Sequence, residues 1–300
     1  MSLLVTGSIG IDTVHTPFGK RVDLVGGSAV YFSCAAAFFT PVRLVGAVGE
    51  DCPPNLLNVF EGRPIDASGV EVRKGSKTFR WHGSYVKNLN EAETVHVHLN
   101  VLGEHAAPIP TQFLDSKHVF LANSHPRLQR ETLQKLQSPM LVVADTMNLW
   151  IENEEDELLK LLPLVHGLIL NDAEVRMLTQ EPNLVLAARK AQKLGPKFVI
   201  VKKGEHGCLM VTESEVFVLP AYPLEKVVDP TGAGDSFAGG MIGYLSTQDN
   251  LSPLTLKRAL AFGTVVASFT ISDFSLDGLK SASRPLIDAR CEEFRKSMTF

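Results

Sequence analysis

From about residue 118 onward, short apolar runs alternate with segments of helical periodicity. In 128–136 the apolar positions are 128, 133 and 136, and in 184–194 they include 184, 187, 188, 191 and 194. Near-continuous apolar strands are typical of a parallel sheet covered on both faces, and strands separated by helices indicate right-handed βαβ crossovers. The predicted strands of this part are 119–122, 141–144, 168–170 and 198–201.

The N-terminal part adds predicted strands at 3–9 and 42–48, with an alanine-rich helix at 29–39 between them. Together these elements predict an α/β protein with a mostly parallel central sheet. Ligands of such sheets bind beyond the carboxyl ends of the strands. Polar residues that directly follow a strand are therefore the first candidates for a site.

One stretch breaks this alternation, because its apolar residues are spaced by two rather than by 3.6. Phe79, Trp81 and Tyr85 share one face of such a strand, and the apolar residues of 95–101 alternate with polar ones. This spacing predicts half-buried antiparallel strands. We expect a small sheet, or lid, that projects from the main domain.

The aromatic stripe of the lid has two open interpretations. Phe79, Trp81 and Tyr85 can pack onto the main domain or onto a second copy of the chain, or they can face a substrate. A pattern of this kind reports burial and does not identify the partner. Because an unpaired strand edge needs cover, a homodimer through the lid is also predicted.

Composition narrows the classes of function. At 300 residues the chain buries a core without help from disulfides or metals, and a net charge of −4 gives no footprint for nucleic acid or an anionic membrane. Four scattered cysteines without a C-x-x-C pair, and the absence of a membrane-spanning run, predict a cytoplasmic protein. An anionic ligand must therefore be held by a local device.

The segment 229–240, DPTGAGDSFAGG, supplies such a device. Gly232 and Gly234 allow a tight turn, and the amides at the start of the following helix can then converge on an anion. Asp235 falls in the first helical turn, where it can accept the proton of a hydroxyl group beside that anion. The arrangement indicates phosphoryl transfer to an alcohol. The alternative is a glycine-rich turn with Asp235 as an ordinary cap.

The same segment resembles the C-terminal signature of the ribokinase-like (PfkB-type) carbohydrate kinases, D-T/P-T-G-A-G-D-x-F-x-G-G. Segments that resemble other motifs of the family follow its order along almost the whole chain, namely 26–29, 46–51, 171–174 and 202–207. The resemblance implies one ribokinase-like kinase domain over 1–300. It has three α/β/α layers and a small antiparallel β lid formed by about 10–25 and 70–102.

The resemblance also implies a role for each residue of the signature. Asp235 is the catalytic base for a hydroxymethyl group, and the amides of Gly232, Ala233 and Gly234 form the anion hole for the γ-phosphoryl group of ATP. Asp229 and the Thr231 carbonyl lie where many members of the family hold a monovalent cation such as K⁺.

Nucleotide and metal sites are implied by the two middle motifs. Asn171 organises the phosphates, and Glu174 holds Mg²⁺ through water; the same two residues also form a good capping box. Lys202, Gly204 and Gly207 occupy the nucleotide loop, where Gly204 and Gly207 can equally form a simple hairpin turn.

On the acceptor side, the resemblance implies that Asp12 binds sugar hydroxyls and that Gly26 and Gly27 let a helix approach the substrate. Asn123 directly follows a predicted strand and therefore lies at the carboxyl-end crevice. Asp12 and Asn123 are also residue types that turns favour.

Two departures from the family pattern bear on the substrate. Tyr31 stands where the family commonly has asparagine, and with Phe79 and Trp81 it forms either a pocket for a nucleobase or part of the core. Lys202 and the lysine after it replace a common Thr-Leu pair. The leading hypothesis is an ATP-dependent kinase of a sugar or sugar-like molecule. The alternatives are an adenosine-like nucleoside kinase and a catalytically silent regulator that binds sugar or nucleotide.

Overall fold

The computed structural model describes residues 2–298. Its main sheet has nine strands in the order β13-β12-β11-β10-β9-β8-β1-β4-β5. Every pairing is parallel except those of β12 with β11 and β13. The strands are β1 (Leu3–Thr6), β4 (Val42–Gly49), β5 (Ile65–Arg73), β8 (His118–Leu121), β9 (Leu141–Asp145), β10 (Gly167–Asn171), β11 (Phe198–Lys202), β12 (Cys208–Thr212) and β13 (Val216–Leu219).

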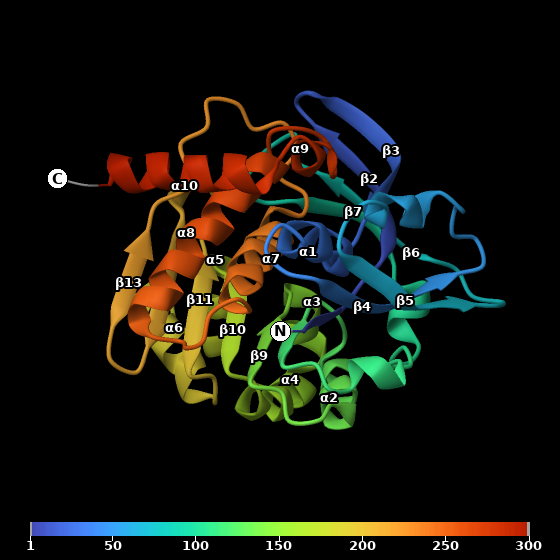
Figure 1. The fold of residues 1–300 in the computed structure, drawn as a ribbon, viewed down its shortest axis with the longest axis horizontal. Coiled ribbons are helices and arrows are strands. Elements are labelled where there is room, and N and C mark those ends of the chain that lie inside the picture. The colour runs from blue at the N-terminus through green and yellow to red at the C-terminus, as the bar shows by residue number, and fades with distance from the viewer. Residues whose placement is uncertain (1, 299–300) are drawn as a thin grey trace.

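Helices cover both faces of this sheet, which confirms the predicted three layers (Figure 1). One layer contains α1 (Ser28–Ala36), α7 (Ala233–Leu245), α8 (Pro253–Thr270), α9 (Asp277–Lys280) and α10 (Arg284–Ser297). The other contains α2 (Pro126–Lys135), α3 (Asn148–Asn153), α4 (Glu155–Leu161), α5 (Asp172–Thr179) and α6 (Leu184–Lys193). Short 3-10 helices occupy Leu56–Phe60, Asn100–Gly103, Thr111–Phe113, Leu162–Leu164 and Gly204–His206.

The apolar runs are continuous because both faces of each central strand are buried. In β10, Ile169 belongs to the core under α1, α7 and α8, while Leu168 and Leu170 belong to the core under α5 and α6. Among the helices of residues 2–298, none combines the length and the apolar character that a bilayer crossing needs.

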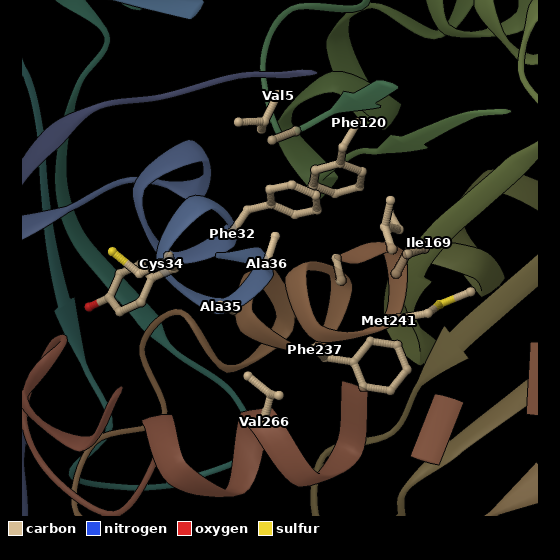
Figure 2. Close-up of a cluster of buried hydrophobic side chains, with 14 of the residues drawn as sticks. Val5, Phe32, Cys34, Ala35, Ala36, Phe120, Ile169, Phe237, Met241 and Val266 are labelled. Atoms are coloured by element: carbon tan, nitrogen blue, oxygen red, sulfur yellow. The ribbon is translucent and has the colours of Figure 1, made fainter. Parts of the chain in front are cut away.

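The centre of the larger core lies between α1 and the sheet. Phe32 of α1 stacks on Phe120 of β8, with ring centroids 4.3 Å apart and an interplanar angle of 12°. Figure 2 shows this pair beside Ala36, with Phe237 and Met241 of α7 in the same cluster. The packing fixes α1 and the start of α7 relative to the carboxyl ends of the strands.

A second, four-stranded sheet lies at one side of the molecule, in the order β3-β2-β6-β7 (Figure 1). Its strands are β2 (Gly10–Thr16), β3 (Gly19–Gly26), β6 (Phe79–Ser84) and β7 (Glu93–His98). The β2–β3 and β6–β7 pairs are antiparallel, whereas the central pair, β2 with β6, is parallel. We call this small sheet the lid.

Some sequence boundaries need correction. Residues 70–73, expected in the lid, belong to β5 at the edge of the main sheet. The alternation of residues 95–101 predicted a half-buried strand, but β7 is exposed on both faces, with Val95 43% and Val97 41% accessible. Alternation alone does not say whether anything covers the apolar side. The first strand ends at Thr6, and the helix expected at 29–39 ends at Ala36.

Because α1 packs closely against α7, we expect any side chain at Gly239 to destabilise the fold. A Cβ atom at Gly239 would lie 2.5 Å from the Phe32 carbonyl oxygen and 2.7 Å from Ala35 Cβ. We predict that Gly239→Ala lowers the free energy of unfolding by roughly 1–3 kcal/mol in urea titrations. Gly103→Ala is the control, because its Cβ would meet only the Leu99 side chain, at 3.4 Å from Cβ and 3.8 Å from Cδ1, which are ordinary contacts. Equal stability of the two variants would contradict the prediction.

Candidate active site

A glycine turn opens α7 at the carboxyl ends of the central strands. Gly232 has a φ of 72°, and a Cβ there would collide with the ring of Tyr31. The N–H of Ala233 donates to the Pro230 carbonyl oxygen at 3.1 Å, whereas those of Gly232 and Gly234 have no backbone acceptor among residues 2–298. Two of the three predicted anion-hole amides are thus available, and that of Ala233 is engaged within the turn.

Asp235, in the first turn of α7, lies in a group of charged side chains that also includes Asp145 of β9 and Lys202 of β11. Burial and the negative charge of Asp145 raise the pKa of Asp235 to about 7, and the Lys202 ammonium group opposes that rise. Lys202 Nζ lies 3.7 Å from Asp145 Oδ1. A carboxyl group with a pKa near neutrality is suited to take a proton at physiological pH.

Asn171 and Glu174 begin α5 on the other side of this group. Asn171 Oδ1 accepts the Glu174 N–H at 2.8 Å, and Glu174 Oε2 accepts the Asn171 N–H at 2.6 Å. The capping box is therefore present, and it uses the acceptor of Asn171 but not its amide donors. Burial raises the pKa of Glu174 to about 7, while Lys202 lowers it.

Asp12 lies on β2 of the lid, buried against the main domain. A Cβ at Gly26 would collide with its carboxylate, and a Cβ at Gly27 would collide with the Ser8 carbonyl oxygen, so both glycines are required by close approach. Burial, followed by the charges of Asp229 and Asp235, raises the pKa of Asp12 to about 8. Asp12 Oδ1 has no hydrogen-bond partner in the described residues.

Asp229 ties together the two loops below the turn. Its Oδ1 accepts the Thr231 N–H at 2.9 Å, and its Oδ2 accepts the Ser275 N–H at 3.0 Å. The hydroxyl group of Tyr31 faces Ser275, and burial raises the pKa of Tyr31 well above its ordinary value. Tyr31 is therefore packed in the core beneath the turn.

The aromatic stripe of the lid lies on the same face as Asp12, because Trp81 is the direct partner of Asp12 in the β2–β6 register. Phe79 packs against Gly10 of the neighbouring strand. Tyr85 is buried and faces Thr231, next to the turn. Trp81 remains partly exposed; its Nε1 donates to Thr94 Oγ1 at 3.2 Å, and its ring meets Tyr85 edge-on at 6.4 Å.

Asn123 follows β8 as predicted, but protein groups occupy its side chain. Trp150 Nε1 donates to Asn123 Oδ1 at 2.9 Å, and Asn123 Nδ2 donates to Met147 Sδ at 3.0 Å. Sequence reasoning missed Asp145, which directly follows the apolar run of β9. The rule that selected Asn123 would also have selected Asp145.

The nucleotide-loop glycines lie in the β11–β12 hairpin. Gly204 and Gly207 have φ values of 53° and 78°. Asn90, from the loop between β6 and β7, crosses to this hairpin: its Nδ2 donates to Glu205 Oε1 at 2.8 Å, and its Oδ1 accepts the Glu205 N–H at 2.9 Å. The tip of the lid is thus bound to the hairpin.

Known structures share this fold. The aminoimidazole riboside kinase of Salmonella enterica, solved with aminoimidazole riboside and an ATP analogue, matches with a TM-score of 0.80 at 17% identity, over 97% of this chain and 100% of that chain. A nucleoside kinase of Burkholderia thailandensis, solved in complex with ADP-inosine, matches with a TM-score of 0.79 at 18% identity, over 97% and 95%. The chain has a ribokinase-like fold.

Sequence comparison gives the family. The pfkB family carbohydrate kinase model matches residues 24–280. A cytidine kinase of Thermococcus kodakarensis is 32% identical over 81% of this chain and 88% of that protein, and a ribokinase of Arabidopsis thaliana is 29% identical over 75% and 62%. The chain belongs to the pfkB family of carbohydrate kinases, and it is a phosphotransferase that uses an alcohol group of a sugar or nucleoside as acceptor.

The buried Asp12 is expected to cost stability. Its pKa is about 8 in the fold against 3.8 for a free side chain, so between these values the folded state holds a proton that the unfolded state has lost. Stability therefore falls as pH rises through this range. We predict that Asp12→Asn raises the free energy of unfolding by roughly 1–3 kcal/mol at pH 7.5 and by less at pH 5.

Denaturant titrations at the two pH values check this prediction. Asp66→Asn is the control of opposite sign, because the pKa of Asp66 is lowered by hydrogen bonds from Ser68. That substitution should slightly destabilise the fold at both pH values. A loss of stability in Asp12→Asn that does not vary with pH would show that Asp12 is ionised in the fold.

Proposed function

We propose that this protein transfers the γ-phosphoryl group of ATP to the hydroxymethyl group of a ribonucleoside. The observation that carries the proposal is the position of Asp235, which lies in the first turn of α7 near two available amides and interacts electrostatically with both Lys202 and Asp12. A base, an anion site and a second carboxyl group for the acceptor's hydroxyls thus lie close together.

The reaction follows from these positions. Asp235 takes the proton of the acceptor's hydroxymethyl group, and the oxygen of that group forms a bond to the γ-phosphorus. The bond from the γ-phosphorus to the β–γ bridging oxygen breaks, which releases ADP. The amides of Gly232 and Gly234 bind the transferring group, whose charge is spread over its outer oxygens. Asp12 holds the acceptor through its other hydroxyls.

The phosphates lie toward β10 and β11 in this proposal. Asn171 offers its amide donors to them, and Lys202, Gly204 and Gly207 form the nucleotide loop. Glu174 fits Mg²⁺ held through water, because its cap uses Oε2 and because Mg²⁺ takes few protein ligands beside substrate phosphates. The ion supplies charge neutralisation between the phosphates when it is bound.

A monovalent cation fits less well. Both oxygens of Asp229 accept backbone N–H groups, from Thr231 and Ser275. Each oxygen of Asp229 therefore has only one lone pair left for K⁺, and we derive no step through such an ion.

Trp81 favours a nucleoside over a free sugar as acceptor. It is partly exposed on the Asp12 face of the lid, where a ring can stack on a nucleobase attached to the bound ribose. The cytidine kinase and the nucleoside kinase among the matches agree with this proposal.

The exposed faces of β7, with Val95 and Val97, are the surface through which we propose that two lids associate.

An ADP-release screen with cytidine, adenosine, inosine, ribose, hexoses, sugar acids and polyols tests the acceptor class. Turnover on nucleosides above that on ribose supports the proposal. Highest turnover on a free sugar would transfer the assignment to a sugar kinase. Binding without turnover on any compound would favour a silent regulator.

Replacing Trp81 should separate recognition of the base from recognition of the ribose. Loss of stacking costs about 1–3 kcal/mol per base, so we expect Trp81→Ala to raise the KM for the preferred nucleoside about 10- to 100-fold, with ribose turnover unchanged. Phe18→Ala is the matched control, since Phe18 is an exposed aromatic residue in the turn between β2 and β3 of the lid. Equal effects of Trp81→Ala on nucleoside and ribose would rule out stacking.

Removing the base should abolish chemistry while nucleotide binding persists. We predict that Asp235→Ala lowers kcat by at least about 10²-fold, because general-base catalysis contributes 10²–10⁴-fold. The Kd for ADP, measured by calorimetry, should change less than about threefold. Asp277→Ala is the control, as Asp277 is likewise an aspartate in a first helical turn, that of α9. A near wild-type kcat for Asp235→Ala would exclude it as the base.

A further inference from the structure

Lys202 reaches from the end of β11 to the turn that opens α7. A Cβ atom placed on Gly234 would lie 2.8 Å from Lys202 Nζ and 3.5 Å from its Cδ and Cε atoms. The ammonium group therefore lies against the second glycine of the turn. The Gly234 amide is one of the two available donors described above, so a fixed positive charge stands beside them.

Asp145 is the partner of this ammonium group. Its Oδ1 lies 3.7 Å from Lys202 Nζ, which is close enough for an ion pair but too long for a hydrogen bond. The Lys202 side chain is 21% exposed and that of Asp145 is 6% exposed. The pair is thus held in a poorly hydrated place, while the N–H donors of Lys202 are not committed to Asp145.

The surrounding charges keep Lys202 protonated. Burial lowers the pKa of Lys202, but the carboxylates of Asp145, Glu174 and Asp235 together raise it above its ordinary value. Without this cation, three carboxylates would stand beside the anion site and repel a triphosphate. The position is also the one at which the chain departs from the common Thr-Leu pair of its family.

We propose that the Lys202 ammonium group binds the γ-phosphoryl group of ATP next to the Gly232 and Gly234 amides, and that Asp145 is a positioning residue that holds it there. The inference rests on the proposed function. Lys202 keeps its proton throughout: the proton of the acceptor hydroxyl goes to Asp235, and Lys202 stabilises the negative charge on the outer phosphoryl oxygens as the bridging bond breaks.

This assignment differs from general nucleotide binding, because it predicts discrimination between a triphosphate and a diphosphate. Calorimetry with the magnesium complexes of the non-hydrolysable analogue AMP-PNP and of ADP measures that discrimination without any acceptor. For Lys202→Met we expect AMP-PNP to bind about 10- to 100-fold more weakly, as for loss of a charge-assisted hydrogen bond. The Kd for ADP should change less than about threefold, and Lys202→Arg should retain most of the AMP-PNP affinity.

A matched control separates this effect from loss of any lysine ion pair. Lys190 on α6 forms an ion pair with Glu181 at 2.8 Å, and neither residue belongs to the candidate active site. Lys190→Met should leave both affinities unchanged. Equal losses of ADP and AMP-PNP affinity in Lys202→Met would place Lys202 elsewhere on the nucleotide, and unchanged affinities would make the pair purely structural. Either result overturns the proposal.

Asp145 is tested by a double-mutant cycle. Asp145→Asn should weaken AMP-PNP more than ADP in the wild-type background and should add no such loss in the Lys202→Met background. The double variant also removes both charges, so it keeps the test valid if Lys202→Met alone fails to fold around an unpaired carboxylate. Additive losses would show that Asp145 acts independently of Lys202.

The proposed function and this inference can fail separately. A wild-type protein that binds AMP-PNP through Lys202 but phosphorylates no acceptor contradicts the proposed function and supports the inference. A kinase whose Lys202→Met variant keeps its preference for AMP-PNP over ADP contradicts only the inference. A wild-type protein that binds neither nucleotide contradicts both.

Discussion

The contact between α1 and α7 is the constraint on which the site depends. Gly239 lets the two helices approach until only backbone and a methyl group separate them, and Gly232 rests on the ring of Tyr31. Phe32 anchors α1 to the sheet through Phe120. Because packing helps to fix the start of α7, the amides of Gly232 and Gly234 can remain available. A larger residue at Gly232 or Gly239 would move the turn.

Electrostatics adds a second constraint, because the candidate active site gathers acidic groups in a chain whose net charge is already negative. Burial raises the pKa values of Asp12 and Asp235; the charges of Asp229 and Asp235 raise that of Asp12 further, and the charge of Asp145 raises that of Asp235. Such a cluster destabilises the empty protein and favours ligands that bring hydroxyl donors or cations. Binding of an acceptor and a metal–nucleotide complex therefore relieves this repulsion and adds to the free energy of binding.

The sequence predicted what local chemistry determines. Apolar runs buried on both sides identified the parallel strands, as Ile169 and its neighbours illustrate, and the glycines around Asp235 identified the turn. The exposure of β7 was not predictable, because alternation of Val95 and Val97 with polar residues does not reveal whether a partner covers them. The approach of Asp145 to Lys202 depends on the side-by-side pairing of β9, β10 and β11, which only the assembled sheet defines.

The bridge between Asn90 and Glu205 joins residues 115 positions apart. It connects the β11–β12 hairpin of the main sheet to the loop between β6 and β7 of the lid, so a shift of either one pulls on the other through two hydrogen bonds. We expect a movement of the lid loop to be passed on to the hairpin that carries Gly204 and Gly207. An order of arrival and departure for two reactants can arise from this fastening alone, without any signal passing through the core.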